Sequence, residues 1–136
     1  METKQRYTLS KEERLKSRKT IEQLFKAGKS FSSFPLKVHW LFTSTPGQFL
    51  QTGFGVSTKN FKKAVDRNRI KRLMREAYRL QKNTLNEKLK KNNRQLVVFF
   101  IYVGNELPEY KLVFDKTGTA LIRLIKITDE NSLAGT

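Results

Sequence analysis

The stretch KNFKKAVDRNRIKRLMREAYRLQK, residues 59–82, decides how this chain is organised. It holds ten Lys and Arg residues and two acids, so it carries +8 of the formal net charge of +16 in a chain of 136 residues. From Asp66 onward it contains no Gly or Pro, and residues that favour helices dominate. The stretch therefore predicts a helix that begins between Phe61 and Asp66.

On a helical wheel this stretch has an apolar stripe and a basic face. The stripe consists of Ile70, Leu73, Met74 and Ala77. The basic face consists of Asn68, Lys71, Arg72, Arg75, Arg79 and Lys82. Like charges four residues apart, as at Lys71, Arg75 and Arg79, repel by about 0.2–0.5 kcal/mol per pair. A polyphosphate backbone would remove this repulsion, which favours nucleic-acid binding over a merely solvated helix face.

The same residues carry a family resemblance. The segment Arg67-Asn68-Arg69, followed by Lys71, Arg72 and Arg75 and preceded by GVSTK at residues 55–59, resembles the signature of the protein subunit of bacterial ribonuclease P. Looser agreement extends over about residues 15–127. The resemblance implies an α+β fold of α-β-β-β-α-β-α order, with a small mixed sheet of about four strands packed by helices. It also implies a left-handed β-α-β crossover that carries the basic helix, although physics prefers a right-handed one.

Composition sets the outer limits. Hydrophobic residues make up 38% of the chain, with ten Phe, so we expect residues 1–136 to form one domain around a single core. A pI near 10.3 indicates an acidic polymer or an anionic surface as the partner. There is no Cys, which excludes disulfides and thiolate metal sites. We expect no secretory signal and no membrane-spanning segment, and we expect a cytoplasmic protein.

The N-terminal part predicts one helix after a flexible stretch at residues 1–8. Ser10 and Glu13 fit a capping box that opens a short turn, and Ser17 is a second candidate cap. Apolar side chains at residues 21, 24 and 25, with Gly28 as a stop signal, predict a helix over residues 18–27.

Two strands are expected next. Residues 30–34 are interpreted as a loop. Leu36, Val38, Trp40 and Phe42 then alternate with Lys37, His39 and Leu41, and the first set is predicted to face the core. A register slip of one residue would exchange His39 and Trp40 between the faces. After a turn at residues 45–48, residues 49–57 form the second strand, in which Gly53 and Gly55 permit a bulge or a close approach. We expect these two strands to form a hairpin.

The C-terminal part predicts a strand and a helix. Residues 83–93 are expected to form a frayed helical piece and then a loop. The apolar run LVVFFIYV, residues 96–103, fits a strand covered on both faces and parallel to the one before the basic helix. A closing amphipathic helix around residues 121–125 ends near Thr128. Gly118 obscures its start, and residues 129–136 are expected to be disordered.

Protein-based catalysis is poorly supported. His39 is the single histidine, and the twelve acids are scattered. We therefore predict no catalytic residue and no metal site in the chain. The resemblance implies that the RNA subunit of ribonuclease P cuts the bond with Mg²⁺ held mainly by that RNA. The chain would then be the protein subunit of an endoribonuclease that binds ribonuclease P RNA and the 5′ leader of precursor tRNA, with no evident protein partner.

The resemblance assigns two surfaces. The RNA-binding surface comprises Lys59, Lys62, Lys63, Arg67, Asn68, Arg69, Lys71, Arg72, Arg75 and Arg79. The leader-binding cleft lies between the first helix and the open face of the sheet, and comprises Ile21, Phe25, Lys37 and His39. Arg67 and Arg69 flank the main basic face, so we expect one of them to contact the leader or the core.

Three other functions compete with this hypothesis. A ribosomal or other structural RNA-binding protein has the same composition, but it needs no apolar groove of single-strand width beside its basic helix. A DNA-binding protein usually has a dimer surface, which no segment here indicates. A membrane-surface helix would carry Leu, Phe or Trp on its apolar face. The stripe of the basic helix is more typical of packing on a sheet.

Overall fold

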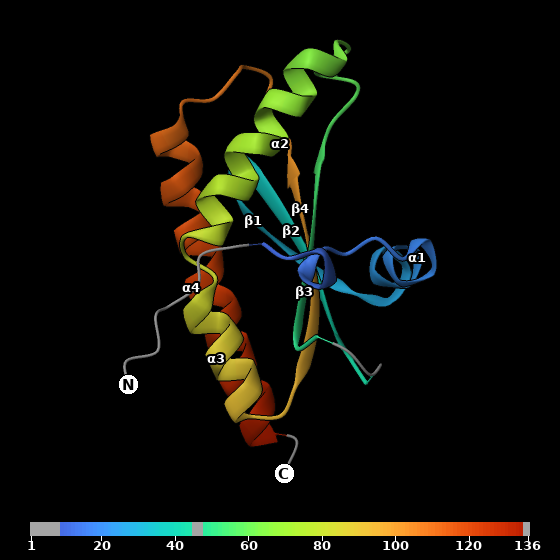
Figure 1. Ribbon diagram of the computed structural model, residues 1–136, viewed down its shortest axis with the longest axis vertical. Coiled ribbons are helices and arrows are strands. Elements are labelled where there is room, and N and C mark those ends of the chain that lie inside the picture. Colours follow the sequence, from blue (N-terminus) through green and yellow to red (C-terminus); the bar gives the residue numbers. More distant parts are fainter. Residues whose placement is uncertain (1–8, 45–47, 135–136) are drawn as a thin grey trace.

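Helices cover both faces of one four-stranded sheet (Figure 1). The computed structural model describes residues 9–44 and 48–134. The elements are η1 (Lys11–Glu13), α1 (Arg18–Ala27), β1 (Lys29–Ser33), β2 (Leu36–Thr43), β3 (Leu50–Val56), α2 (Ala64–Arg79), α3 (Asn83–Lys91), β4 (Gln95–Tyr102) and α4 (Tyr110–Ala134). Helices α2, α3 and α4 lie on one face and α1 lies on the other. The α+β class and the order of elements are confirmed.

The strand order is β1-β2-β4-β3. Strand β2 is antiparallel to β1 and to β4, and β3 is parallel to β4, as predicted for strands joined by a helix. The expected hairpin of β2 and β3 is wrong, because β4 lies between them. Residues 96–98 and 100 of β4 are buried, and a strand apolar on both faces is stabilised by a central place in the sheet.

The connection from β3 through α2 and α3 to β4 is left-handed (Figure 1). The chain rises along β3 nearest the viewer, descends through the helices to the left, and rises again along β4 behind.

The loop predicted at residues 30–34 is also wrong. Residues 29–33 form the edge strand β1, which is held by pairing with β2 and by the buried ring of Phe31.

The predicted register of β2 is confirmed. Trp40 is 9% exposed and belongs to the core under the three helices, together with Leu36 and Val38. His39 is half-buried and faces α1, where its ring lies against that of Phe25. The slip that would exchange His39 and Trp40 is therefore excluded.

Local signals fix α1 at its predicted bounds. Ser17 Oγ accepts a hydrogen bond of 3.3 Å from the backbone N–H of Thr20. A Cβ atom at Gly28 would lie 2.8 Å from the carbonyl oxygen of Trp40, so this position needs glycine for close approach. The capping box at Ser10 forms only in part. The Ser10 hydroxyl donates to the Glu13 carboxylate, at 3.1 Å, rather than capping a backbone N–H.

Two C-terminal expectations are corrected. Helix α3 is not frayed, because Leu85 and Leu89 are fully buried. Helix α4 begins at Tyr110, passes through Gly118 and continues beyond Thr128 to Ala134, so residues 129–134 are helical rather than disordered. The predictions for residues 1–8, 45–47 and 135–136 lie outside the described residues.

Candidate nucleic-acid interface

Helix α2 separates its two faces as the sequence predicts. Ile70, Met74 and Ala77 are buried against the core, and Leu73 is half-buried. The exposed basic face consists of Asn68, Arg69, Arg72 and Arg75. These four side chains make no hydrogen bond or ion pair with the residues that the structure describes. Their donors are therefore available to a partner, while Lys71 is half-buried beside them.

The segment before α2 is folded against the domain. Phe61 is 7% exposed, and its ring centroid lies 5.9 Å from that of Tyr102. Arg67 Nη1 donates to the carbonyl oxygens of Phe61 and Lys62, at 2.9 and 2.7 Å. Arg67 is thus the residue of the Arg67/Arg69 pair that turns back to the protein. The exposed ammonium groups of Lys59, Lys62 and Lys63 extend the positive charge beyond the helix.

Arg79 stands apart from the exposed basic face because an acid holds it. Its Nε and Nη2 atoms donate to the two carboxylate oxygens of Glu76, at 2.7 and 2.6 Å. The hydrogen bond from Arg79 holds the pKa of Glu76 below its ordinary value. Glu76 thus places a negative charge beside the basic face, and this pairing reduces the part that Arg79 can play in binding RNA.

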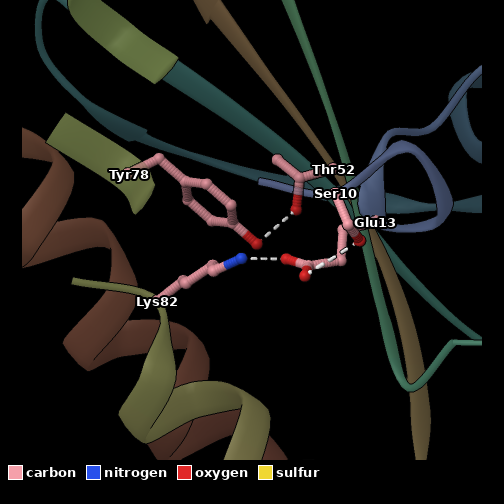
Figure 2. A network of polar contacts seen from close by, with 5 residues as sticks. All are labelled: Ser10, Glu13, Thr52, Tyr78 and Lys82. Atoms are coloured by element: carbon pink, nitrogen blue, oxygen red, sulfur yellow. Dashed lines mark hydrogen bonds and ion pairs between the residues drawn. The ribbon is translucent and has the colours of Figure 1, made fainter. Parts of the chain in front are cut away.

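Lys82 does not lie on the basic face, and that prediction is wrong. It follows α2, it is 3% exposed, and its ammonium group pairs with the carboxylate of Glu13 (Figure 2). Next to this pair, the Thr52 hydroxyl donates to the Tyr78 hydroxyl at 2.6 Å. Burial raises the pKa of Tyr78, so its hydroxyl stays protonated. The Glu13–Lys82 pair joins η1 to the start of α3, and the Thr52–Tyr78 hydrogen bond joins β3 to α2.

The α1 side of the sheet brings the predicted cleft residues together. Phe25 is 43% exposed, and its ring centroid lies 4.6 Å from that of His39. Ile21, one turn earlier in α1, is half-buried against the small core of Leu15, Leu24 and Val97. Partial burial, and then the charge of exposed Lys37, lower the pKa of His39, so the imidazole is neutral at pH 7.

Sequence reasoning missed Phe99 at this site. Its ring lies 5.3 Å from that of Phe25, edge to face, on the open side of β4. A Cβ atom at Gly53 would lie 2.7 Å from the Phe99 ring, and one at Gly55 would lie 2.9 Å from it. The two glycines of β3 therefore make room for this ring. No sequence pattern singles out Phe99, because residues 96–103 are apolar at every position. Its place beside His39 follows from the pairing of β2 with β4, in which His39 lies opposite Phe99.

The two candidate surfaces lie on opposite faces of the sheet (Figure 1). Within residues 9–44 and 48–134, no three His, Asp or Glu side chains are grouped as ligands for a metal ion. Over the same ranges, no helix is both long and apolar enough to span a membrane.

Residues 9–124 match the model of the Ribonuclease P family. The ribonuclease P protein component of Porphyromonas gingivalis (strain ATCC 33277) is 39% identical over 119 residues, which cover 87% of each chain. This chain belongs to the ribonuclease P protein family. The family functions in RNA binding and precursor-tRNA processing as part of ribonuclease P, and its RNA partner is the ribonuclease P RNA.

Further similarities agree with membership in the ribonuclease P protein family. The protein component from Chlorobium phaeobacteroides is 33% identical over 134 residues, covering 89% of this chain and 92% of the relative. The solved structure of the Staphylococcus aureus RNase P protein matches with a TM-score of 0.56 and 23% identity, over 85% of this chain and 94% of that one. The similarity to the Staphylococcus aureus structure concerns the fold alone.

Proposed function

We propose that the exposed basic face of α2 binds the ribonuclease P RNA near its reactive centre, and that the α1 side of the sheet receives the 5′ leader of precursor tRNA. The first part rests on the donors of Asn68, Arg69, Arg72 and Arg75, which are exposed together and form no hydrogen bond or ion pair with a described residue. The proposed substrate implies a cytoplasmic location.

The chemistry of the basic face suits phosphate. Each guanidinium group offers two parallel N–H donors to one phosphate, and the Asn68 amide can bridge a phosphate or a base edge. Lys59, Lys62 and Lys63 add a diffuse positive field that steers RNA toward α2. Arg67 braces the start of the helix through its bonds to two backbone carbonyls.

The leader side offers an apolar platform with one cation. A base stacked on the exposed ring of Phe25 would contribute about 1–3 kcal/mol. Lys37, two residues from His39 on the same face of β2, would meet a leader phosphate. Ile21 supports the platform by packing in the small core under α1 rather than by stacking.

Cleavage itself is assigned to the RNA subunit. Mg²⁺ bound mainly by that RNA would supply the activated water and stabilise the leaving oxygen. The described residues of this chain do not fit a carboxylate site for the ion. The protein instead binds the RNA and the leader, which raises the affinity for substrate and for the metal ions that the RNA uses.

The decisive experiment measures cleavage of precursor tRNA at low Mg²⁺ by ribonuclease P RNA alone, by RNA with this protein, and by the protein alone. We expect cleavage at the mature 5′ end only when both components are present. Arg72→Ala/Arg75→Ala should weaken it at least tenfold, whereas Lys90→Ala/Lys91→Ala, which removes the same charge from exposed positions on α3, should not. RNA binding without any effect on cleavage would favour a structural RNA-binding protein, and cleavage by the protein alone would contradict the assignment.

The leader contact is tested separately. The affinity of the holoenzyme is compared for precursor tRNA with a leader and for mature tRNA. Phe25→Ala should lower the affinity for precursor tRNA by about tenfold, consistent with the loss of one stacked base, and leave the affinity for mature tRNA unchanged. Phe34→Ala is the matched control, because Phe34 is 69% exposed in the turn between β1 and β2. Equal effects of the two variants would refute the leader contact.

A further inference from the structure

A groove of about 680 Å³ lies between the β1 edge of the sheet and α4. Its walls include Lys29, Phe31, Trp40, Thr119, Arg123 and Lys126. Strand β1 is at the opposite end of the strand order from β3, against which α2 packs. Phe31 and Trp40 belong to the core on the helix-covered face, whereas α1 lies on the other face. The groove is therefore distinct from both surfaces described above.

Two aromatic rings hold cations at the rim of this groove. Lys29 Nζ lies 5.8 Å from the centroid of the Trp40 ring. Arg123 Cζ lies 4.5 Å from the centroid of the Phe31 ring. Each contact restricts a flexible side chain before any ligand binds, so less conformational entropy is lost on binding. Phe31 is 8% exposed and Trp40 is 9% exposed, so their rings orient the two cations but leave no room for a stacked base.

The charge of the groove is unbalanced. Lys29, Arg123 and Lys126 are all exposed, and Glu130 is the one acid among the lining residues. Arg123 and Lys126 are three residues apart on α4, so they project from the same side of the helix. None of the three cations forms an ion pair with a described residue. This arrangement suits a chain of phosphates better than a neutral or basic peptide.

We propose that this groove binds the phosphate backbone of the ribonuclease P RNA, as a second contact independent of the α2 face. The inference rests on the proposed function, because it takes that RNA as the partner. Helix α4 packs against α2 in the same layer, so one large folded RNA lying over this layer can reach both surfaces. The 5′ leader, assigned to the α1 side, lies across the sheet from the groove.

The first test measures the affinity for ribonuclease P RNA as a function of salt. The slope of log K against log salt is negative, and each lost phosphate contact reduces its magnitude by about 0.7–0.9. Lys29→Ala/Arg123→Ala/Lys126→Ala should therefore reduce the magnitude by about 2–3. Affinity at physiological salt should fall by about tenfold. Lys90→Ala/Lys91→Ala/Lys111→Ala removes the same charge from exposed positions outside the groove and should change both quantities much less.

A charge-preserving variant guards against misfolding. Lys29→Arg/Lys126→Arg should retain the affinity of the original protein, and thermal melts followed by circular dichroism should show that all variants fold. Equal losses in the groove variant and in its matched control would overturn the proposal. A loss confined to precursor tRNA, measured on the assembled holoenzyme, would overturn the assignment to the ribonuclease P RNA.

The second test locates the RNA directly. The chain has no Cys, so single-cysteine variants can carry an iron chelate that cleaves nearby RNA by hydroxyl radicals. Thr119→Cys lines the groove, and Val65→Cys lies on α2, where Val65 is 74% exposed. We expect each probe to cut the ribonuclease P RNA at a different set of nucleotides. Cleavage from Val65 alone would overturn the groove proposal, and cleavage from neither would overturn the proposed function with it.

Discussion

Replacing Glu13 by Gln removes the counter-charge of a buried ammonium group. The side chain of Lys82 is 4% exposed and that of Glu13 is 24% exposed, and their ion pair joins η1 to the start of α3 (Figure 2). Breaking a buried ion pair by removing one partner costs about 3–5 kcal/mol. Because water reaches Glu13 and Gln keeps an amide oxygen near Lys82, we expect the free energy of unfolding to fall by about 2 kcal/mol.

The assay is urea unfolding followed by the fluorescence of Trp40, which is the single tryptophan and lies in the core. The melting temperature should fall by roughly 6–8 °C for a chain of this length. Asp129→Asn is the matched control. This substitution breaks the ion pair of Asp129 with Lys88, in which the Lys88 side chain is 31% exposed and the Asp129 side chain 46% exposed. It should lower the free energy of unfolding by less than about 1 kcal/mol.

A double variant separates the charge from other effects. Glu13→Gln/Lys82→Met replaces the pair with an uncharged, mostly apolar one, which should recover most of the lost stability. The loss of stability in the double variant should therefore be smaller than the sum of the losses in Glu13→Gln and in Lys82→Met. Two outcomes would contradict a stabilising role for the buried ion pair. One is a loss for Glu13→Gln no larger than that for Asp129→Asn, and the other is a loss in the double variant equal to the sum of the losses in Glu13→Gln and Lys82→Met.

The same substitution should separate the two proposed binding surfaces. The segment from η1 leads into α1, and the Leu15 N–H donates to the Thr52 carbonyl at 3.0 Å. Loosening η1 should therefore disturb the α1 side more than α2. We expect Glu13→Gln to weaken the leader-dependent part of precursor-tRNA affinity while the affinity for ribonuclease P RNA stays within about twofold. A loss of RNA affinity alone would contradict this.

Three further predictions concern single side chains. Gly53→Ala should cost about 1–3 kcal/mol in urea unfolding, because its Cβ meets the ring of Phe99 at 2.7 Å, and an unchanged midpoint would contradict the close packing. The folded state lowers the pKa of His39, so the unfolded chain binds that proton more tightly, and the free energy of unfolding should fall as pH drops below about 6.5. His39→Gln should flatten this part of the pH profile, and superimposable profiles would disprove the coupling. Glu76→Gln should strengthen binding to ribonuclease P RNA by about threefold at low salt and by less at high salt, because it removes a negative charge beside the basic face. A weaker complex would instead show that Glu76 positions Arg79 for binding.

Much of the fold follows from local patterns. Ser17 and the apolar residues of α1 predict the helix at its observed bounds, since a cap and a 3.6-residue period depend only on neighbours in sequence. The two-residue period of β2 places His39 and Trp40 on their observed faces. The stripe of α2 likewise predicts its buried side.

Strand partners were not available from such patterns. Strands β2 and β3 are adjacent in sequence and each is compatible with a hairpin, yet both pair with β4. The choice depends on β4, some 40 residues further on, whose burial on both faces favours the central position. Strand β1 escaped detection because Phe31 is its one apolar residue, and its stability comes from pairing with β2.

The candidate site shows the same division. Sequence alone gives the density of Lys and Arg on α2 and places Phe25 in an amphipathic helix, because charge and periodicity are properties of the chain itself. The tertiary structure decides which cations remain exposed, since that depends on where distant acids lie. Glu13 approaches Lys82 from 69 residues away and removes it from the basic face. Folding also brings α4 beside β1, and so creates a basic groove. In the sequence, Arg123 and Lys126 follow Lys29 by 94 and 97 residues, yet all three line this groove.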